Sequence, residues 1–414
     1  MEIKKGYKKT EMGVIPSDWD VKEFVEVMDG FTSGQTPYRG VASYYKGQIP
    51  WITSGELNYN VITETNEKIT SEGIKEANLK IIPKGTFLFA ITGLEAEGTR
   101  GSCAITGVEA TTNQSCMALY PKKNLLITSY LYHYYVRYGN ELALKYCQGT
   151  KQQSYTGGIA KKLPIIVPPT IEEQISIATT LSDTDALISS LEKLIAKKRT
   201  IKQGAMQELL KPKKGWEVMR LGDMGYLKNG INKPSDEFGF GYPFINLLDV
   251  FGRSKMSSRE QLGLVNSTEA DRKMYNIKKG DVLFIRSSVK PEGVGLTCII
   301  EEDLQDTVYS GFIIRFRGNG FLCDEFKEHC FGSDHFRNKL IASSSVSANT
   351  NINQKSLRNL VLHFPKSKSE QVKIANILSD MDSEILALES KLQKYRQLKS
   401  GMMQILLTGQ IRLV

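Results

Sequence analysis

The sequence predicts an α+β protein made of two copies of one repeat, each a globular α/β domain followed by a long helix. Residues 173–210 align with residues 370–407 without a gap, at an offset of 197. Trp19 and Trp216 stand at the same offset, so the repeat includes the globular part. The helical stretches also share the apolar spacing of a coiled coil. We therefore expect the two helices to pair with each other.

The aligned stretches carry the signals of helix ends and of a helical seam. Each opens with a capping box, Thr170 before Glu173 and Ser367 before Glu370. Pro212 is expected to end the first helix, and Gly409 the second. Apolar residues of the second stretch recur at steps of mostly three and four: Ile374, Leu378, Met381, Ile385, Leu388, Leu392, Tyr395, Leu398, Met402 and Ile405. The first stretch keeps the seam at Ile177, Leu181, Leu191, Ile195, Ile201 and Ala205.

Charge indicates how the helices pair. Acidic residues gather early in each helix, such as Asp185 and Asp382, and basic residues gather late, such as Arg199 and Arg396. A parallel pair would set like charges together, whereas an antiparallel pair sets acid against base and suits the helix dipoles. We expect an intramolecular antiparallel coiled coil. The alternative is two separate amphipathic helices, each packed on its own domain.

The repeat predicts four parts of the chain. Globular domains are expected at 1–169 and 213–366, and helical regions at 170–212 and 367–414. Between the short β-like runs of each domain lie polar loops that differ almost completely. The first domain reads TGLEAEGTRG where the second reads SSVKPEGVGL. A shared scaffold with unlike loops is typical of two binding modules for different targets.

Composition sets broad limits on the class of protein. The chain has 414 residues and a net charge of +9, which favours an acidic partner without naming one. No run is long and apolar enough for a membrane helix, and the N-terminal residues lack the apolar core of a signal peptide. We expect a cytoplasmic protein that does not bind a membrane. The six cysteines form no CxxC pair and are expected to be reduced and mostly buried.

No catalytic or cofactor motif emerges. Gly93 and Gly98 have the spacing of a phosphate loop, but the Lys-Ser/Thr pair that would follow is missing. No dinucleotide-binding GxGxxG and no GxSxG motif is present. His329, Cys330, His335 and Cys323 match no common zinc pattern, and the first repeat has no counterpart. We therefore expect no metal, no cofactor and no catalytic residue.

Basic, amide and aromatic residues in the matched loops favour DNA as the ligand. Arg and Lys can bind guanine edges or phosphates, and Asn and Gln can pair with adenine. Taken singly, each is more often a solvated loop residue. The candidates in the first domain are Gln35, Tyr38, Arg39, Tyr44, Tyr45, Lys46, Arg100, Lys151, Gln152, Gln153 and Tyr155. Those in the second are Asn229, Asn232, Lys233, Arg253, Lys255, Arg259, Arg286, Lys290, Asn349, Asn351 and Asn353.

The order of globular domain, helix, globular domain and helix resembles the specificity subunits of type I restriction-modification enzymes. Local phrases support the resemblance over nearly the whole chain: GVIP at 13–16 leading to Trp19, IPWI at 49–52, the Glu-Gln helix openings, and LTGQIR at 407–412. The resemblance implies two target recognition domains, each reading one half of a split DNA sequence. It also implies that the helical regions bind two modification subunits, with restriction subunits joining later.

The resemblance places catalysis, the methyl donor and ATP in those partners. Base-reading residues differ between members of the family, so none is carried over. We expect the long helices to expose more surface than they can cover for each other, with Arg199, Lys202, Arg396 and Lys399 as candidate contacts to the modification subunits. Helix length is then expected to set the spacer between the half-sites.

Two other functions remain open from the sequence. A coiled-coil adaptor whose globular ends bind proteins would share this layout, and DNA binding that weakens steeply with salt would exclude it. A self-contained DNA methyltransferase is disfavoured, because donor-binding glycines and a catalytic motif are missing.

Overall fold

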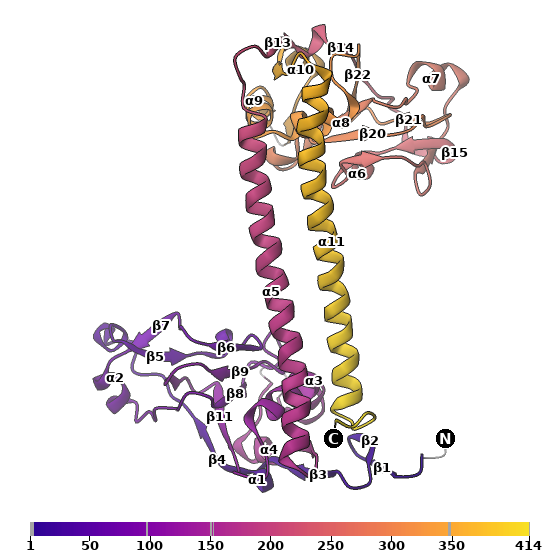
Figure 1. Ribbon diagram of the computed structural model, residues 1–414. Helices are drawn as coiled ribbons and strands as arrows, with labels where there is room; N and C mark the ends of the chain where they lie inside the picture. The colour runs from indigo at the N-terminus through magenta and orange to yellow at the C-terminus, as the bar shows by residue number, and fades with distance from the viewer. Residues whose placement is uncertain (1–3, 97, 150, 152, 347–348, 414) are drawn as a thin grey trace. The chain divides into compact units, whose positions relative to one another are not determined.

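The computed structural model describes residues 4–96, 98–149, 151, 153–346 and 349–413. The chain divides into two compact units (Figure 1). Unit 1 comprises Met1–Glu192 and Lys391–Val414, and unit 2 comprises Lys193–Ser390. Each unit therefore contains one globular part and segments of both long helices.

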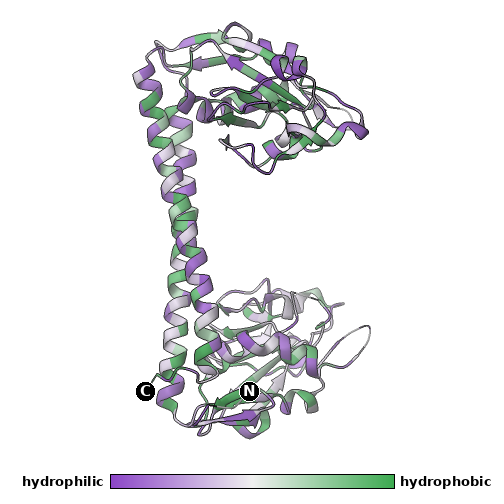
Figure 2. Ribbon diagram, turned by 90° about the vertical axis from the view of Figure 1, so that its right-hand side faces the viewer, coloured by the Kyte–Doolittle hydropathy of each residue, from purple (hydrophilic) through white to green (hydrophobic). Residues whose placement is uncertain are grey.

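The two long helices are α5, Ile171–Leu209, and α11, Lys368–Leu406, each of 39 residues. Polar and apolar residues alternate along both (Figure 2). In unit 1, Lys399 late in α11 pairs with Asp185 early in α5 at 2.6 Å. In unit 2, Lys198 pairs with Glu384 at 2.6 Å. The helix segments thus run antiparallel within each unit, which confirms the pairing expected from charge.

In unit 1 the main sheet has five strands, in the order β4-β11-β8-β9-β6. Their bounds are Met28–Ser33, Cys116–Pro121, Phe87–Ala90, Cys103–Thr106 and Asn60–Ile62. A three-stranded sheet has the order β10-β5-β7, with bounds Thr111–Thr112, Ile49–Ile52 and Glu67–Ile69. Two further pairs are β3 with β12, Asp20–Glu23 and Pro164–Val167, and β1 with β2, Tyr7–Thr10 and Gly13–Pro16. The α-helices before α5 are α1, α2, α3 and α4: Phe24–Val27, Ser71–Glu76, Thr128–Tyr146 and Gly157–Lys161.

Unit 2 repeats this topology. Its five-stranded sheet has the order β14-β22-β18-β20-β16, with bounds Gly225–Asn229, Ile313–Gly318, Val282–Ile285, Thr297–Ile300 and Lys255–Met256. A three-stranded sheet β17-β15-β21 spans Gly263–Val265, Phe238–Ile245 and Val308–Tyr309. β13 pairs with β25, Glu217–Arg220 and Val361–Phe364, and β19, β24 and β23 form a small sheet, Ser287–Ser288, Thr350–Asn351 and Ser345–Val346. The helices are α6 to α10: Leu247–Val250, Glu269–Met274, Asp324–Gly332, Asp334–Ala342 and Gln354–Asn359.

Each core forms where one helix packs on the five-stranded sheet. In unit 1 the ring of Tyr135 on α3 packs edge-on against Phe87 and Phe89 of β8. In unit 2 the ring of Phe331 on α8 packs in the same way on Phe284 of β18. Cys103 and Cys298 lie fully buried on the equivalent strands β9 and β20, as the repeat predicts.

The prediction of the helix seam is wrong at one place, in both repeats. Ile201 and Leu398 were expected in the seam, but both are exposed. The neighbouring Lys202 and Lys399 are half-buried instead, paired with Asp382 and Asp185 of the opposite helix. Strict alternation of steps of three and four reaches these lysines and leaves the apolar residue beside each of them outside the seam.

The capping boxes form only in part. The hydroxyl of Thr170 accepts from the Glu173 N–H at 3.2 Å, as expected. The Glu173 carboxylate, however, is fully buried and binds Arg412 instead of its own helix end. In the second repeat the Glu370 carboxylate accepts from Trp216 Nε1 at 3.2 Å. These longer-range contacts replace the return bond of the box. They attach the start of α5 to the segment after α11, and the start of α11 to Trp216 of unit 2.

Candidate nucleic-acid interface

Arg39 and Tyr45, both predicted to contact DNA, hold a loop of unit 1 together. The guanidinium of Arg39 donates to both carboxylate oxygens of Glu67, at 2.6 and 2.9 Å, and lies over the rings of Tyr45 and Trp51. The hydrogen bond from Arg39 lowers the pKa of Glu67. Arg39 and Tyr45 therefore shape this loop, and their polar ends are already engaged.

Their neighbours on the same loop face outward. Gln35, Tyr38 and Lys46 have exposed side chains, whereas Tyr44 is half-buried and packs on Gly73. Aromatic and amide groups held on a braced loop are suited to contact base edges or sugar. Gln35, Tyr38 and Lys46 thus form the outward-facing part of this loop.

Two further loops of unit 1 lie side by side. The Leu94 N–H donates to the Gln153 carbonyl at 3.0 Å, and Thr92 forms a bridge with Ser154. Arg100 donates to the carbonyl oxygens of Leu94 and Glu95, at 2.8 and 3.0 Å. Arg100 therefore closes its own loop.

The structure does not place Tyr155 at this surface. Its side chain is 3% exposed and packs against Phe89, and burial raises the pKa of its hydroxyl. Because the ring packs on an apolar residue of strand β8, Tyr155 is a core residue. Lys151 beside it is exposed, Gln153 is half-buried, and Gln152 lies outside the described residues.

In unit 2, Asn229, Asn232 and Arg286 come together around Gly311 and α10. Arg286 Nη1 lies 3.3 Å from the Gly311 carbonyl, to which it donates. A Cβ added at Gly311 would lie 2.0 Å from the Asn232 side-chain oxygen, so the Asn232 side chain lies directly against Gly311. The Gln354 side-chain oxygen of α10 accepts from the Asn229 N–H at 3.1 Å, and its amide nitrogen donates to the Leu227 carbonyl at 3.1 Å.

A second group lies next to Arg286 along the chain. Strand β19 pairs with β24, which brings Ser287 opposite Asn351. The Asn351 amide donates to the Asn349 carbonyl at 3.0 Å, and Asn353 caps α10 by accepting from a backbone N–H at 2.8 Å. Lys290 in the loop after β19 is exposed.

The remaining basic candidates of unit 2 contact other elements. Lys233 pairs with Asp271 at 3.2 Å, and Lys255 pairs with Glu328 at 3.1 Å. Arg259 donates to the Gln305 carbonyl at 2.8 Å, and Arg253 is exposed after α6. The structure thus brings part of the predicted set together around Gly311 and β19, and assigns Lys233, Lys255 and Arg259 contacts elsewhere.

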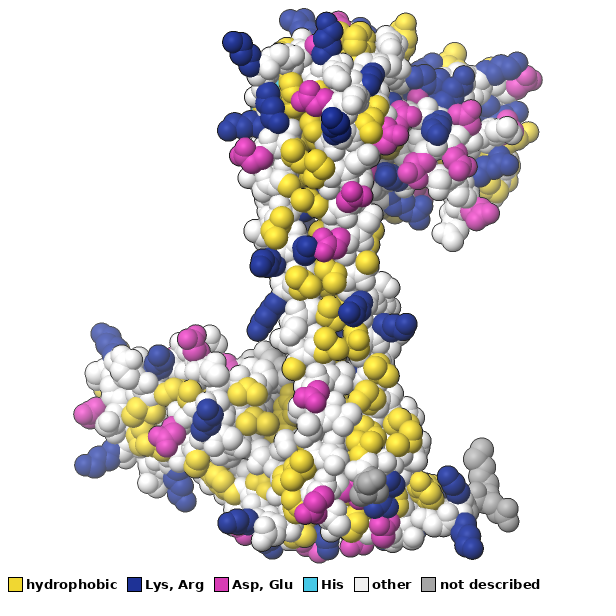
Figure 3. Space-filling view, in the orientation of Figure 1, with side chains coloured by type: hydrophobic (Ala, Val, Ile, Leu, Met, Phe, Trp, Pro, Cys, Tyr) yellow, Lys and Arg dark blue, Asp and Glu magenta, His cyan; other side chains and the backbone are white. Residues whose placement is uncertain are grey.

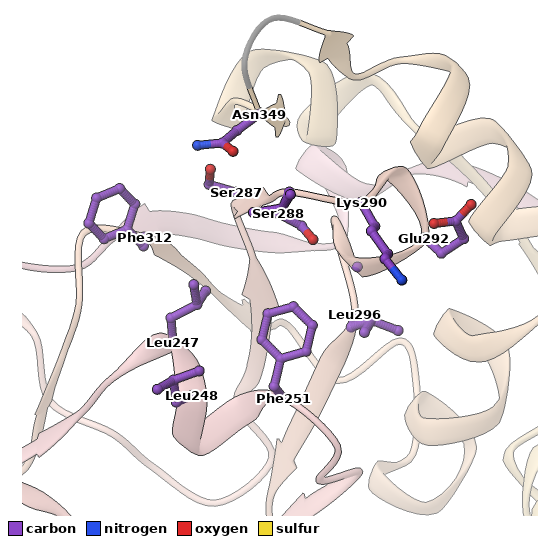
Figure 4. A pocket seen from close by; sticks show the side chains of 12 residues that line it. Leu247, Leu248, Phe251, Ser287, Ser288, Lys290, Glu292, Leu296, Phe312 and Asn349 are labelled. Atoms are coloured by element: carbon purple, nitrogen blue, oxygen red, sulfur yellow. The ribbon is translucent and has the colours of Figure 1, made fainter. Parts of the chain in front are cut away.

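A hollow that the polar pattern did not reveal opens beside β19. It has a volume of about 710 Å³. Figure 4 shows Leu247, Leu248 and Phe251 on one side of it and the Ser287–Lys290 loop on the other. Apolar residues inside an otherwise polar loop, such as Val289 beside Lys290, are the sequence signal that could have indicated it.

Comparison with known proteins identifies the family. The model of the type I restriction modification DNA specificity domain matches residues 16–203 and again residues 213–399. The chain belongs to the type I restriction-modification specificity subunits. The predicted family and fold class are therefore confirmed, and this specificity subunit carries two DNA specificity domains.

Individual relatives agree with the family. The chain is 30% identical to the specificity subunit of the type I restriction enzyme MjaIX of Methanocaldococcus jannaschii, over 68% of this chain and 69% of that one. Identity to the MjaVIII specificity subunit of the same organism is 22%, over 96% and 94% of the two chains. The crystal structure of the S subunit from M. genitalium shares the fold, with a TM-score of 0.57, 14% identity and 98% of each chain covered.

The four basic helix residues of the specificity subunit form a symmetric set of ion pairs. Arg199 binds Glu389 at 2.5 Å and Arg396 binds Glu192 at 2.6 Å, one pair in each unit. Lys202 and Lys399 form the seam pairs described above. All four predicted partner contacts therefore hold the helices together.

Exposed apolar residues also lie on the long helices of the specificity subunit. Hydrophobic side chains follow the helices in Figure 3, while many Lys and Arg side chains lie over the globular parts. Leu194 and Ile201 on α5, and Leu386 and Leu398 on α11, are exposed.

The described part of the chain includes no helix long and apolar enough to cross a membrane. The same residues contain no group of three or more His, Cys, Asp and Glu side chains arranged to hold a metal ion.

Proposed function

We propose that unit 1 and unit 2 of this specificity subunit each read one half of a bipartite DNA sequence. The observation that carries the proposal is the repeated topology with unlike loops. Both units have the same five-stranded and three-stranded sheets, while the loops after β8 and β18 differ in sequence and contacts. Equivalent scaffolds present equivalent surfaces to the duplex, and unlike loops make the two half-sites unlike.

Within each unit, exposed loop side chains are proposed to make the contacts. Those in unit 1 are Gln35, Tyr38, Lys46 and Lys151, and those in unit 2 are Arg253 and Lys290. Arg39, Arg100 and Asn353 are proposed to hold the loops that carry them. This division follows from the hydrogen bonds, since a side chain that braces a loop has fewer donors left for a base.

A domain exchange tests the proposal. Residues 213–365 are replaced by the matching region of a relative with a different target, and the assembled enzyme's methylated sites are mapped in DNA. We expect one half of the target to change and the other to remain. The reciprocal exchange of residues 1–169 is the matched control and should change the other half. Changes in both halves after one exchange would show that the units are not independent readers.

The helices are proposed to bind two modification subunits, with restriction subunits joining the complex and with catalysis in those partners. The exposed apolar residues of α5 and α11 support this, since they lie outside the seam and only a further partner could cover them. One solved structure that shares the fold concerns assembly of the type I system, with a TM-score of 0.61, 16% identity and 96% and 99% of the chains covered.

A further inference from the structure

Three exposed apolar side chains surround the hollow of unit 2. Leu248 on α6 is 78% exposed, Val289 in the loop after β19 is 81% exposed, and Phe312 before β22 is 56% exposed. Figure 4 shows Phe312 and Leu248 on the same side of the hollow, facing the loop that carries Lys290. Exposed apolar surface of this kind marks a site that is covered in a complex.

At the three equivalent positions of unit 1, the residue is either buried or lacks an apolar side chain. A capping box follows β5 and again β15, begun by Thr53 and Asn246, and this aligns Leu248 with Gly55. The strands β11 and β22 pair alike with β8 and β18, which aligns Phe312 with Ser115. Both unit 1 counterparts lack an apolar side chain.

The third position differs by burial. The Glu-Gly pairs at 97–98 and 292–293 align Val289 with Leu94. Leu94 is fully buried and its N–H binds the Gln153 carbonyl, whereas Val289 points outward. Partners of one kind that dock on both units would need the surface in both copies. This apolar surface is present in unit 2 alone. The two units are proposed to differ in the half-site that they read, so we connect the surface with the half-site of unit 2.

The side chains around the hollow can pair with the chemical groups that bases display in a DNA groove. Lys290 supplies a cation for a phosphate or a guanine, and the Glu292 carboxylate can accept from the amino group of cytosine. The major groove displays one apolar group, the C5-methyl of thymine. Apolar side chains placed among these polar groups are therefore matched to thymine.

We propose that Leu248, Val289 and Phe312 bind thymine methyl groups in the half-site read by unit 2. This inference rests on the proposed function, because it requires that unit 2 reads DNA. The hollow is larger than one methyl group. We therefore expect it to hold the exposed edge of a base pair, with the thymine methyl group in contact with the apolar residues. Specificity for thymine at that position then comes from apolar contact, with Lys290 holding the register.

Replacement of thymine by uracil tests the proposal, because uracil lacks only the methyl group. The full complex is bound to duplexes of the mapped target in which each thymine is replaced singly. We expect about fourfold weaker binding at one or two thymines of the unit 2 half-site, the value for one buried methyl group at 0.8 kcal/mol. Val289→Ser and Leu248→Ser should reduce this sensitivity. Val218→Ser, another exposed valine of unit 2, is the matched control and should keep it.

Different failures have different meanings. Equal binding of all uracil duplexes, a half-site without thymine, or sensitivity unchanged in both variants would overturn this inference and leave the proposed function intact. The same holds if Val289→Ser impairs assembly of the complex but not DNA binding, since the hollow would then bind protein. A wild-type complex that binds no specific sequence would overturn the proposed function and this inference with it.

Discussion

Two buried histidines show what single residues do in this fold. His133 on α3 lies 2.9 Å from the Ser182 hydroxyl, and His329 on α8 lies 3.1 Å from the Ser379 hydroxyl. Burial lowers the pKa of both, that of His133 to about 4. Asp185 opposes this shift at His133 and Lys399 adds to it. Each globular part is thus attached to its helix through a neutral imidazole.

This contact predicts a loss of stability in acid. Between pH 6.5 and about 4 the unfolded chain protonates His133 and the folded chain does not, so the free energy of unfolding falls as pH falls. A shift of this size corresponds to about 3 kcal/mol. Urea unfolding at pH 7 and pH 4.5 measures it, and His133→Asn should lose part of the difference. Burial lowers the pKa of the exposed His335 as well but by less, so His335→Asn should lose a smaller part. Equal pH dependence in wild type and His133→Asn would contradict the prediction.

Residue roles were the least predictable feature of the sequence. Arg39 and Tyr38 are neighbours of similar promise as DNA contacts, yet Arg39 is bound to Glu67 and Tyr38 is exposed. The difference comes from a partner 28 residues away, which no local pattern contains. The apolar residues of the hollow were not predicted, because polar side chains are the usual sequence signal of DNA binding.

The helices were predicted well, because their signals are local and repeated. Heptad spacing, late basic residues and Gly409 with its left-handed backbone all agree with the structure. Strict alternation of steps of three and four also places Lys202 and Lys399 in the seam, although both are charged. What spacing does not give is their ion-pair partners, Asp382 and Asp185, which lie on the opposite helix.

The ion pair of Arg199 with Glu389 allows two roles of Arg199 to be separated: stabilising the helix pair and contacting a modification subunit. Arg199→Glu should destabilise unit 2 by about 1 kcal/mol, because it sets two carboxylates against each other at an exposed site. Adding Glu389→Arg should restore both stability and assembly with the modification subunits. Stability is measured by urea unfolding and assembly by co-purification. Should the double variant regain stability but not assembly, Arg199 touches a partner directly, as the sequence alone suggested.

At the scale of the whole molecule, the internal repeat predicted the architecture. One offset of 197 residues relates Trp19 to Trp216 and α5 to α11, and sheets of equal topology follow from it. Loop structure did not follow, because loops of unlike sequence find unlike contacts on the same scaffold.

Helix length offers a test of how the two units act together. Adding seven residues after Leu191 and seven after Leu388 keeps the heptad in phase and lengthens each helix by about 10 Å. If the helices set the spacer, the preferred distance between half-sites should grow by about three base pairs, at about 3.4 Å each. Affinity should fall as well, because one half-site also rotates around the duplex. Binding to duplexes whose spacers differ by one base pair measures the optimum. The matched control inserts seven residues after Gln261, in an exposed turn of unit 2, and should leave the optimum unchanged. A folded, DNA-binding variant that kept the original spacing would show that the helices do not determine it.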